Sequence, residues 1–144
     1  ELTGLTKERQ RQQAYLAKLS SGDSVMDYDA ILRTGLEELV IKINDISLIK
    51  DDYPDPVSFQ TALAKDVAAA FEADGTVIYD NEIKPVTIAG RQASCWVLSY
   101  AAEGYMVYNA DISFWQGDYD IAIVLISTGK DRLDEMITMF RAMN

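Results

Sequence analysis

The distribution of apolar residues has two periods along the chain, and they divide it into strand and helix regions. From Thr76 onward the period is two: in 105–115, Met106, Tyr108, Ala110, Ile112 and Phe114 alternate with Asn109, Asp111 and Ser113. Alternation of this kind is typical of β-strands with two different faces. The predicted strands of this region are 76–80, 85–89, 92–101, 105–115 and 119–127. The last is apolar on both faces, which indicates a central strand covered on both sides.

Helical spacing is clearest after the loop "KDDYPDP". Asp55 is a favourable N-cap, Pro56 suits the first helical position and Gly75 suits the end, so we predict a helix between them. A second helix is predicted over Gly129–Asn144, where Thr128 and Asp131 resemble a capping box. The apolar stripe of this second helix is Leu133, Met136, Ile137 and Phe140.

The first third of the chain is harder to interpret. Residues Thr6–Gly22 are predicted to form a helix with a narrow apolar stripe. The segment Met26–Asp45 has leucines at helical spacing, but "ELVIKI" alternates and "RTGLEE" resembles a turn. We interpret the segment as a β-hairpin with strands 26–33 and 38–45.

These elements predict an α+β domain with about six or seven antiparallel strands. Short turns between successive strands require antiparallel pairing, and a central strand apolar on both faces calls for helices on both sides of the sheet. The expected architecture is therefore a three-layer α/β/α sandwich. Residues 26–144 are predicted to form this domain, and residues 1–25 a helix or lead-in segment.

The charge distribution narrows the class of partner. The 144 residues carry a net charge of −10, and residues 21–144 hold nine basic and twenty-one acidic side chains. A strongly anionic surface repels phosphate groups, so nucleic acid and anionic membrane surfaces are unsuitable partners. The longest apolar run, Ile121–Ile126, is far shorter than the ~20 residues of a membrane-spanning helix.

The residues that usually carry out catalysis are scarce. The chain has no histidine and one cysteine, which excludes Ser-His and Cys-His pairs and the common zinc sites. No phosphate-binding glycine motif occurs, and no cofactor is predicted. In "GRQASCWVLSY", Ala93, Cys95 and Val97 alternate with Trp96, Leu98 and Tyr100. We therefore expect Cys95 to be a buried strand residue and to react slowly with thiol reagents.

Acidic loop residues are the first candidate site. Asp51, Asp52 and Asp55 lie in one loop, and Asp118 and Asp120 lie in the turn "GDYD". Oxygen clusters of this kind suit calcium, and paired carboxylates suit acid–base hydrolysis. The competing interpretation is that these are solvated surface acids, with Asp55 serving as a helix cap. The candidate metal ligands are Asp51, Asp52, Asp118 and Asp120.

Aromatic residues are the second candidate site. Tyr105 and Trp115 lie on the same face of one predicted strand as Asn109 and Asp111. If this face is partly exposed, the four residues form a ligand or partner surface. The alternative is packing beneath a helix, which a sheet covered on both faces favours.

Three segments together resemble the PsbP-like and Mog-like fold, most closely the small domains of Gram-positive lipoproteins. They are "MDYDAILRTGLEELVIKINDIS", "VTIAGRQASCWVLSYAAEGYMVYNADISFWQGDYDIAIVLIST" and "DRLDEMITMF". The fold serves as an extracytoplasmic accessory or binding module and as a Ran-binding protein. The resemblance implies no catalytic residues, since the fold shares no catalytic set.

The function expected from these observations is a non-enzymatic, extracytoplasmic binding or accessory module of a bacterial lipoprotein. Its ligand is an unknown protein or small molecule, and a lipid anchor at the cell surface is expected upstream of Glu1 in the full-length protein. The alternatives are a carboxylate-based hydrolase or calcium-dependent module, and an intracellular protein-interaction domain. A signal peptide ending in a lipidated cysteine would separate the first from the last.

Overall fold

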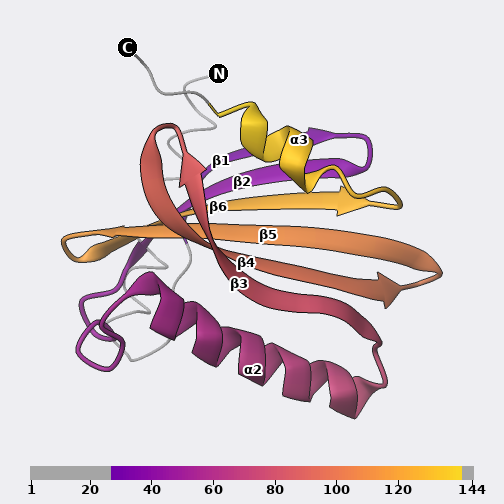
Figure 1. Cartoon of the computed structure of the whole chain (residues 1–144), viewed down its shortest axis with the longest axis horizontal. Coiled ribbons are helices and arrows are strands. Elements are labelled where there is room, and N and C mark those ends of the chain that lie inside the picture. The colour runs from indigo at the N-terminus through magenta and orange to yellow at the C-terminus, as the bar shows by residue number, and fades with distance from the viewer. Residues whose placement is uncertain (1–26, 141–144) are drawn as a thin grey trace, which may run out of the picture.

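The described part of the chain is built around one six-stranded antiparallel sheet. The structure is a computed structural model that describes residues 27–140, with side chains from residue 35 onward. The strands are β1 (Asp27–Thr34), β2 (Glu37–Asp45), β3 (Ile78–Ile88), β4 (Arg91–Ala102), β5 (Tyr105–Gln116) and β6 (Tyr119–Thr128). Their order across the sheet is β1-β2-β6-β5-β4-β3, so β6 and β5 are central and β1 and β3 are the edges (Figure 1).

Most predicted strands are confirmed, and the exception is β3. The predicted pair 76–80 and 85–89 is one continuous strand with a register shift between Ile78 and Asp80. The expected turn fails to form because Asn81 links other elements. Its amide donates to the carbonyl of Ala64 at 3.2 Å and its oxygen accepts from the Trp96 indole at 2.7 Å.

Helix α2 (Pro56–Asp74) confirms the strongest helix prediction. Asp55 accepts a hydrogen bond from the amide of Ser58 at 2.7 Å, and Ser58 completes the capping box. Gly75 ends the helix in the left-handed conformation with φ of 73°, which favours glycine. The capping residues therefore fix where the helix begins over the sheet.

The three-layer sandwich is wrong. The C-terminal helix was predicted over Gly129–Asn144, but α3 spans only Leu133–Thr138, and residues 141–144 lie outside the described residues. Thr128 is the last residue of β6 and its amide donates to Leu36, so it cannot cap a helix, and Asp131 accepts from the amide of Leu133. In the described residues α2 is the one long helix, and α3 is too short to form a second layer (Figure 1).

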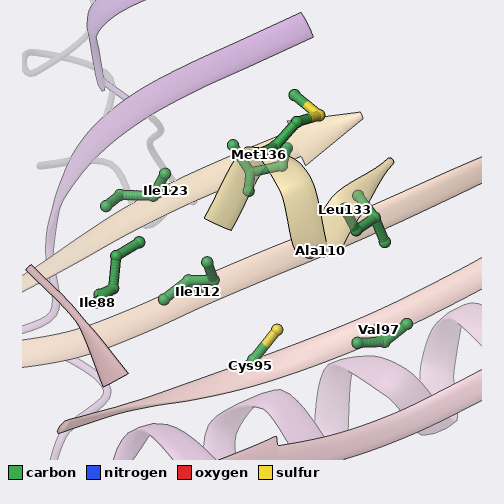
Figure 2. Packing of buried hydrophobic residues seen from close by; sticks show 9 residues of the cluster. Ile88, Cys95, Val97, Ala110, Ile112, Ile123, Leu133 and Met136 are labelled. Atoms are coloured by element: carbon green, nitrogen blue, oxygen red, sulfur yellow. The ribbon is translucent and has the colours of Figure 1, made fainter. Parts of the chain in front are cut away.

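The two faces of the sheet pack differently. On the α3 face, Cys95 and Val97 of β4 join Ile112 of β5 in an apolar cluster with Leu133 and Met136 of α3 (Figure 2). The other members of this cluster are Ile88, Ala110, Ile123 and Leu125. On the α2 face, Trp96 and Leu98 of the same strand pack against Ala64 of α2. This division confirms the two faces predicted for "GRQASCWVLSY".

Cys95 is buried as predicted. It has 0% exposure, and burial raises the pKa of its thiol to about 11. Because the thiolate is the nucleophilic form, this position disfavours chemistry at the sulfur.

Two further predictions concern the N-terminal segment and the membrane-spanning potential of the helices. The helix expected over Thr6–Gly22, and the lead-in segment 1–25 to which it belongs, lie outside the described residues. Within the described residues, neither helix combines the length and apolar character that crossing a membrane requires.

Candidate functional site

A cleft of about 460 Å³ lies between the first turn of α2 and strands β3, β4 and β5. We call it the α2 cleft. It is lined by Pro56, Val57, Ile83, Lys84, Pro85, Gln92, Ala93, Ser94, Ser113, Phe114 and Trp115. Most of these side chains are apolar, and the lining contains no carboxylate.

The strand register explains how the cleft obtains its polar groups. Ser94 lies opposite Pro85 of β3 on one side and opposite Ser113 of β5 on the other. Trp115 follows Ser113 by two residues, so it faces the same side of β5. Its ring lies 6.3 Å from that of Phe59 in α2, measured between centroids. Two short polar side chains therefore lie beside an indole under the start of the helix.

Two buried polar atoms of the cleft lack a hydrogen-bond partner among the described residues: the Ser94 hydroxyl and the Trp115 indole nitrogen. Ser94 is only 5% exposed. The other tryptophan differs, since its indole nitrogen donates to Asn81 at 2.7 Å. An unpaired buried polar group costs about 1–3 kcal/mol, so such atoms are uncommon unless something else supplies the partner.

A buried polar network continues from the cleft toward β6 and β2. The Ser113 hydroxyl donates to Asp120, and the Asn44 amide donates to the same carboxylate at 3.1 Å. Asp120 is 4% exposed, and its burial raises its pKa, against the lowering effect of both hydrogen bonds and of the Lys42 charge. Ser113 thus connects the cleft to a buried acid.

Asp111 is a second acid on the α2 face. Burial raises its pKa to about 6, the charge of Asp120 adds to the rise, and Lys42 opposes it. The Gln60 amide nitrogen donates to the backbone carbonyl of Asp111 at 2.8 Å, and Gln60 is 1% exposed. The side-chain oxygen of Gln60 has no partner in the described part of the chain. Asp111 can therefore hold a proton close to neutral pH.

The structure separates the predicted ligand surface. Tyr105 is 65% exposed at the start of β5, while Asn109, Asp111 and Trp115 are half-buried further along. At about 3.4 Å per residue, Tyr105 lies roughly 34 Å from Trp115 along the strand. The two residues cannot contact one small ligand. Of the four predicted residues, only Trp115 lines the α2 cleft.

The predicted metal ligands also separate. The 46–52 loop does reach the β5–β6 turn, where Ile46 donates to the Asp118 carbonyl and Lys50 forms an ion pair with Asp118. Asp51 and Asp52 are exposed, whereas Asp120 is buried. Among residues 27–140 no three acidic or cysteine side chains are placed to hold a metal ion. The structure therefore brings the two loops together at Lys50 and Asp118, but within the described residues it does not gather the predicted ligands into a metal site.

Sequence reasoning missed Ser94, Ser113, Gln60 and Asn44. Only a weak signal marks these four residues in the sequence, because each is a single polar residue at a position that the helix or strand pattern assigns to a covered face. Ser94 shares its strand face with Trp96 and Leu98, and Gln60 follows Phe59 in the helix predicted between Asp55 and Gly75. Which of such residues surround a cleft depends on strand register, which the sequence alone did not fix.

Comparison with known proteins does not place the chain in a family. No family model and no curated protein matches it. A solved structure of a protein of unknown function, PA94 from Pseudomonas aeruginosa, is 16% identical, with a TM-score of 0.41. The similarity covers 73% of this chain and 69% of that one. Nothing in these comparisons points to the PsbP-like or Mog-like fold.

Proposed function

We propose that the chain is a non-enzymatic binding module whose ligand occupies the α2 cleft. The volume of about 460 Å³ lies within the range of small-molecule sites, which are mostly apolar clefts with a few placed polar groups. The α2 cleft has this composition. Pro56, Pro85 and Trp115 supply apolar walls, and Ser94 and Ser113 supply hydroxyl groups.

The observation that carries the proposal is the unpartnered Ser94 hydroxyl at the cleft. A serine at 5% exposure with no partner among the described residues carries an uncompensated desolvation cost. A ligand that supplies the partner removes that cost only in the bound state. The same reasoning applies to the indole nitrogen of Trp115.

The cleft also lacks the groups for covalent chemistry. Ser113 donates to Asp120, but the chain has no histidine to activate a serine hydroxyl. Cys95 lies on the α3 face with a raised thiol pKa. These features support binding without turnover.

The test is a fragment screen read by the two tryptophan indole N–H signals in a ¹H–¹⁵N spectrum. The chain has two tryptophans, so the Trp96 signal, hydrogen-bonded to Asn81, is an internal control. Cleft binding is expected to shift the Trp115 signal and leave Trp96 in place. If no fragment at millimolar concentration moves the Trp115 signal, the proposal is wrong.

A carboxylate-based hydrolase is the second candidate, and the raised pKa of Asp111 favours it. A carboxyl group with a pKa of about 6 can act as a general acid near neutral pH. It ranks second because neither Asp111 nor Asp120 lines the cleft. The test is hydrolysis of chromogenic glycosides by the wild-type chain and by Asp111→Asn. Turnover that disappears in the variant would place this candidate first.

The extracytoplasmic location and the lipoprotein anchor remain part of the proposal. They are supported by the sequence resemblance described above. The test is to read the segment that precedes Glu1 in the gene. A signal peptide with a lipidated cysteine would support this location, and a continuous cytosolic domain would contradict it.

A further inference from the structure

Resting on this proposed function, we propose that the α2 cleft recognises a neutral secondary amide carried on an apolar body. The inference concerns the chemical class of the ligand. It depends on the donors and acceptors that the cleft leaves unpaired, on their arrangement in the sheet, and on the charges around them.

The unpaired groups match the two sides of an amide. The Trp115 indole only donates a hydrogen bond, so it requires an acceptor such as a carbonyl oxygen. The Ser94 hydroxyl both donates and accepts, so it can take the N–H of the same amide. An ester offers the carbonyl but no N–H, and an amine offers no acceptor once it is protonated.

The sheet places the two groups close enough for one ligand. Ser94 lies opposite Ser113, and Trp115 is the next residue on that face of β5. Diagonal cross-strand neighbours of this kind are about 7–8 Å apart, a separation that an amide with two hydrogen bonds bridges. Both atoms are closed to solvent, so binding requires the Ser94 side chain to rotate toward the cleft and Trp115 to shift against the first turn of α2.

The charges around the cleft favour a neutral ligand. The chain carries a net charge of −10, and the cleft residue Ser113 is bonded to the carboxylate of Asp120. Lys84 is the one cationic side chain of the lining, and Glu82 lies 3.8 Å from its ammonium group. An anion would therefore meet a negative field. A cation would be attracted by the same field but would find no carboxylate in the lining, so it would be desolvated without a direct partner.

Two common biological sources of secondary amides are peptides and N-acetylated amino sugars. The wall residues Pro56, Val57 and Ile83 are apolar and suit the aliphatic part of either source. The shared chemistry is the amide, and separate arms of the experiment distinguish the sources.

The experiment titrates the ¹⁵N-labelled chain with four compounds that share one isopentyl body. They are N-isopentylacetamide, isopentyl acetate, 4-methylvalerate and isopentylamine, which present an amide, an ester, a carboxylate and a cation. The amide is expected to bind at least about tenfold more tightly than each of the others, equivalent to about 1.4 kcal/mol. It is expected to move the Trp115 indole signal downfield. N-acetyl-leucine methylamide and N-acetylglucosamine, with glucose as its control, identify the source.

Two variants test the role of the hydroxyl. Ser94→Ala is expected to weaken amide binding at least about fivefold and to leave ester binding unchanged, since the ester makes no N–H contact. Ser99→Ala is the matched control, because Ser99 is also buried on β4, at 6% exposure, but faces the α3 side. It is expected to bind the amide as the wild type does.

The possible failures are distinguishable. Equal binding of the ester, carboxylate or amine, or an unchanged amide affinity in Ser94→Ala, would overturn the amide inference while the binding module stands. If none of the compounds or the wider fragment set moves the Trp115 signal, the proposed function itself fails and the amide inference fails with it.

Discussion

The two faces of β4 and β5 are made by the same strands but differ in how many unpaired polar groups they bury. On the α3 face, Cys95, Ala110 and Ile112 each have 0% exposure and form part of a continuous apolar cluster. On the α2 face, Ser94 and Asp111 lie among half-satisfied polar groups. Side chains of successive residues point to opposite faces, so one strand can build a core and a site at once.

The comparison suggests a division of roles. Apolar packing on the α3 face provides stability, since burying a large aliphatic side chain contributes about 1.5–3 kcal/mol. The polar groups of the α2 face contribute less or even destabilise, because an unpaired buried donor has a free-energy cost. Residues that reduce stability are commonly retained for function, and substitutions on each face test whether this division is correct.

The largest effect is expected from Leu125→Ala on the α3 face. Leu125 has 0% exposure within the apolar cluster, and the cavity left behind is expected to lower the free energy of unfolding by about 2–5 kcal/mol. Urea denaturation measures this change. The matched control is Leu48→Ala, since Leu48 is 74% exposed, with an expected change within about 0.5 kcal/mol. Similar losses for the two leucines would contradict the packing described.

The next effect is kinetic and also concerns the α3 face. Native Cys95 is expected to react with a thiol reagent at least about 100-fold more slowly than the urea-unfolded chain. The pKa of its thiol rises from 9.0 to about 11, which lowers the thiolate fraction at neutral pH by about that factor. Complete burial adds to the protection. Comparable rates in the native and unfolded protein would show that this face opens readily.

Both predictions concern features that the sequence already indicated. Alternation in "GRQASCWVLSY" correctly placed Cys95 and Trp96 on opposite faces, because the strand period is a local property. The Asp55 cap and the Gly75 stop located α2 for the same reason. Local signals failed where long-range contacts dominate: Asn81 bonds to Ala64 and Trp96 instead of forming a turn.

The site was harder to predict than the strands. The pairing of Ser94 with Ser113 depends on the register of β4 and β5. The position of α2 over Trp115 depends on where the helix packs on the sheet. The sequence analysis grouped Tyr105 with Trp115 because they share one face of the strand, but Tyr105 lies at the far end of that strand. Residues on one face of a strand share a direction but are not all neighbours, which is why the predicted surface is divided.

A pH-dependent effect tests the α2 face. The pKa of Asp111 is about 6, above its ordinary value of 3.8. Below about pH 4 the Asp111 carboxyl is protonated in both the folded and the unfolded chain, so burying it costs little free energy. Between about pH 4 and pH 6 the Asp111 carboxyl of the unfolded chain is already ionised, while that of the folded chain still holds its proton. The free energy of unfolding therefore falls as the pH rises through this range. Above pH 6 the cost of burying the charge is fully present.

Asp111→Asn is therefore expected to stabilise the chain only at higher pH. Two pKa units correspond to about 3 kcal/mol for a fully buried group, and the partial exposure of Asp111 reduces our expectation to about 1–2 kcal/mol at pH 7. The gain is expected to vanish below pH 4, as measured by urea denaturation across the range. Asp66→Asn on the exposed side of α2 controls for net charge. A gain at pH 7 that persists at pH 3.5 would contradict burial of the charge as its cause.

The smallest effect compares the two serines of the cleft. Ser94→Ala removes an unpartnered buried hydroxyl, so it is expected to be neutral or to stabilise by up to about 1 kcal/mol. Ser113→Ala removes the donor to Asp120 and is expected to destabilise by about 1–2 kcal/mol, because a buried carboxylate loses a partner. Urea denaturation at pH 7 distinguishes them. Equal losses for both serines would show that Ser94 is bonded in solution, and its hydroxyl would then not be available to a ligand.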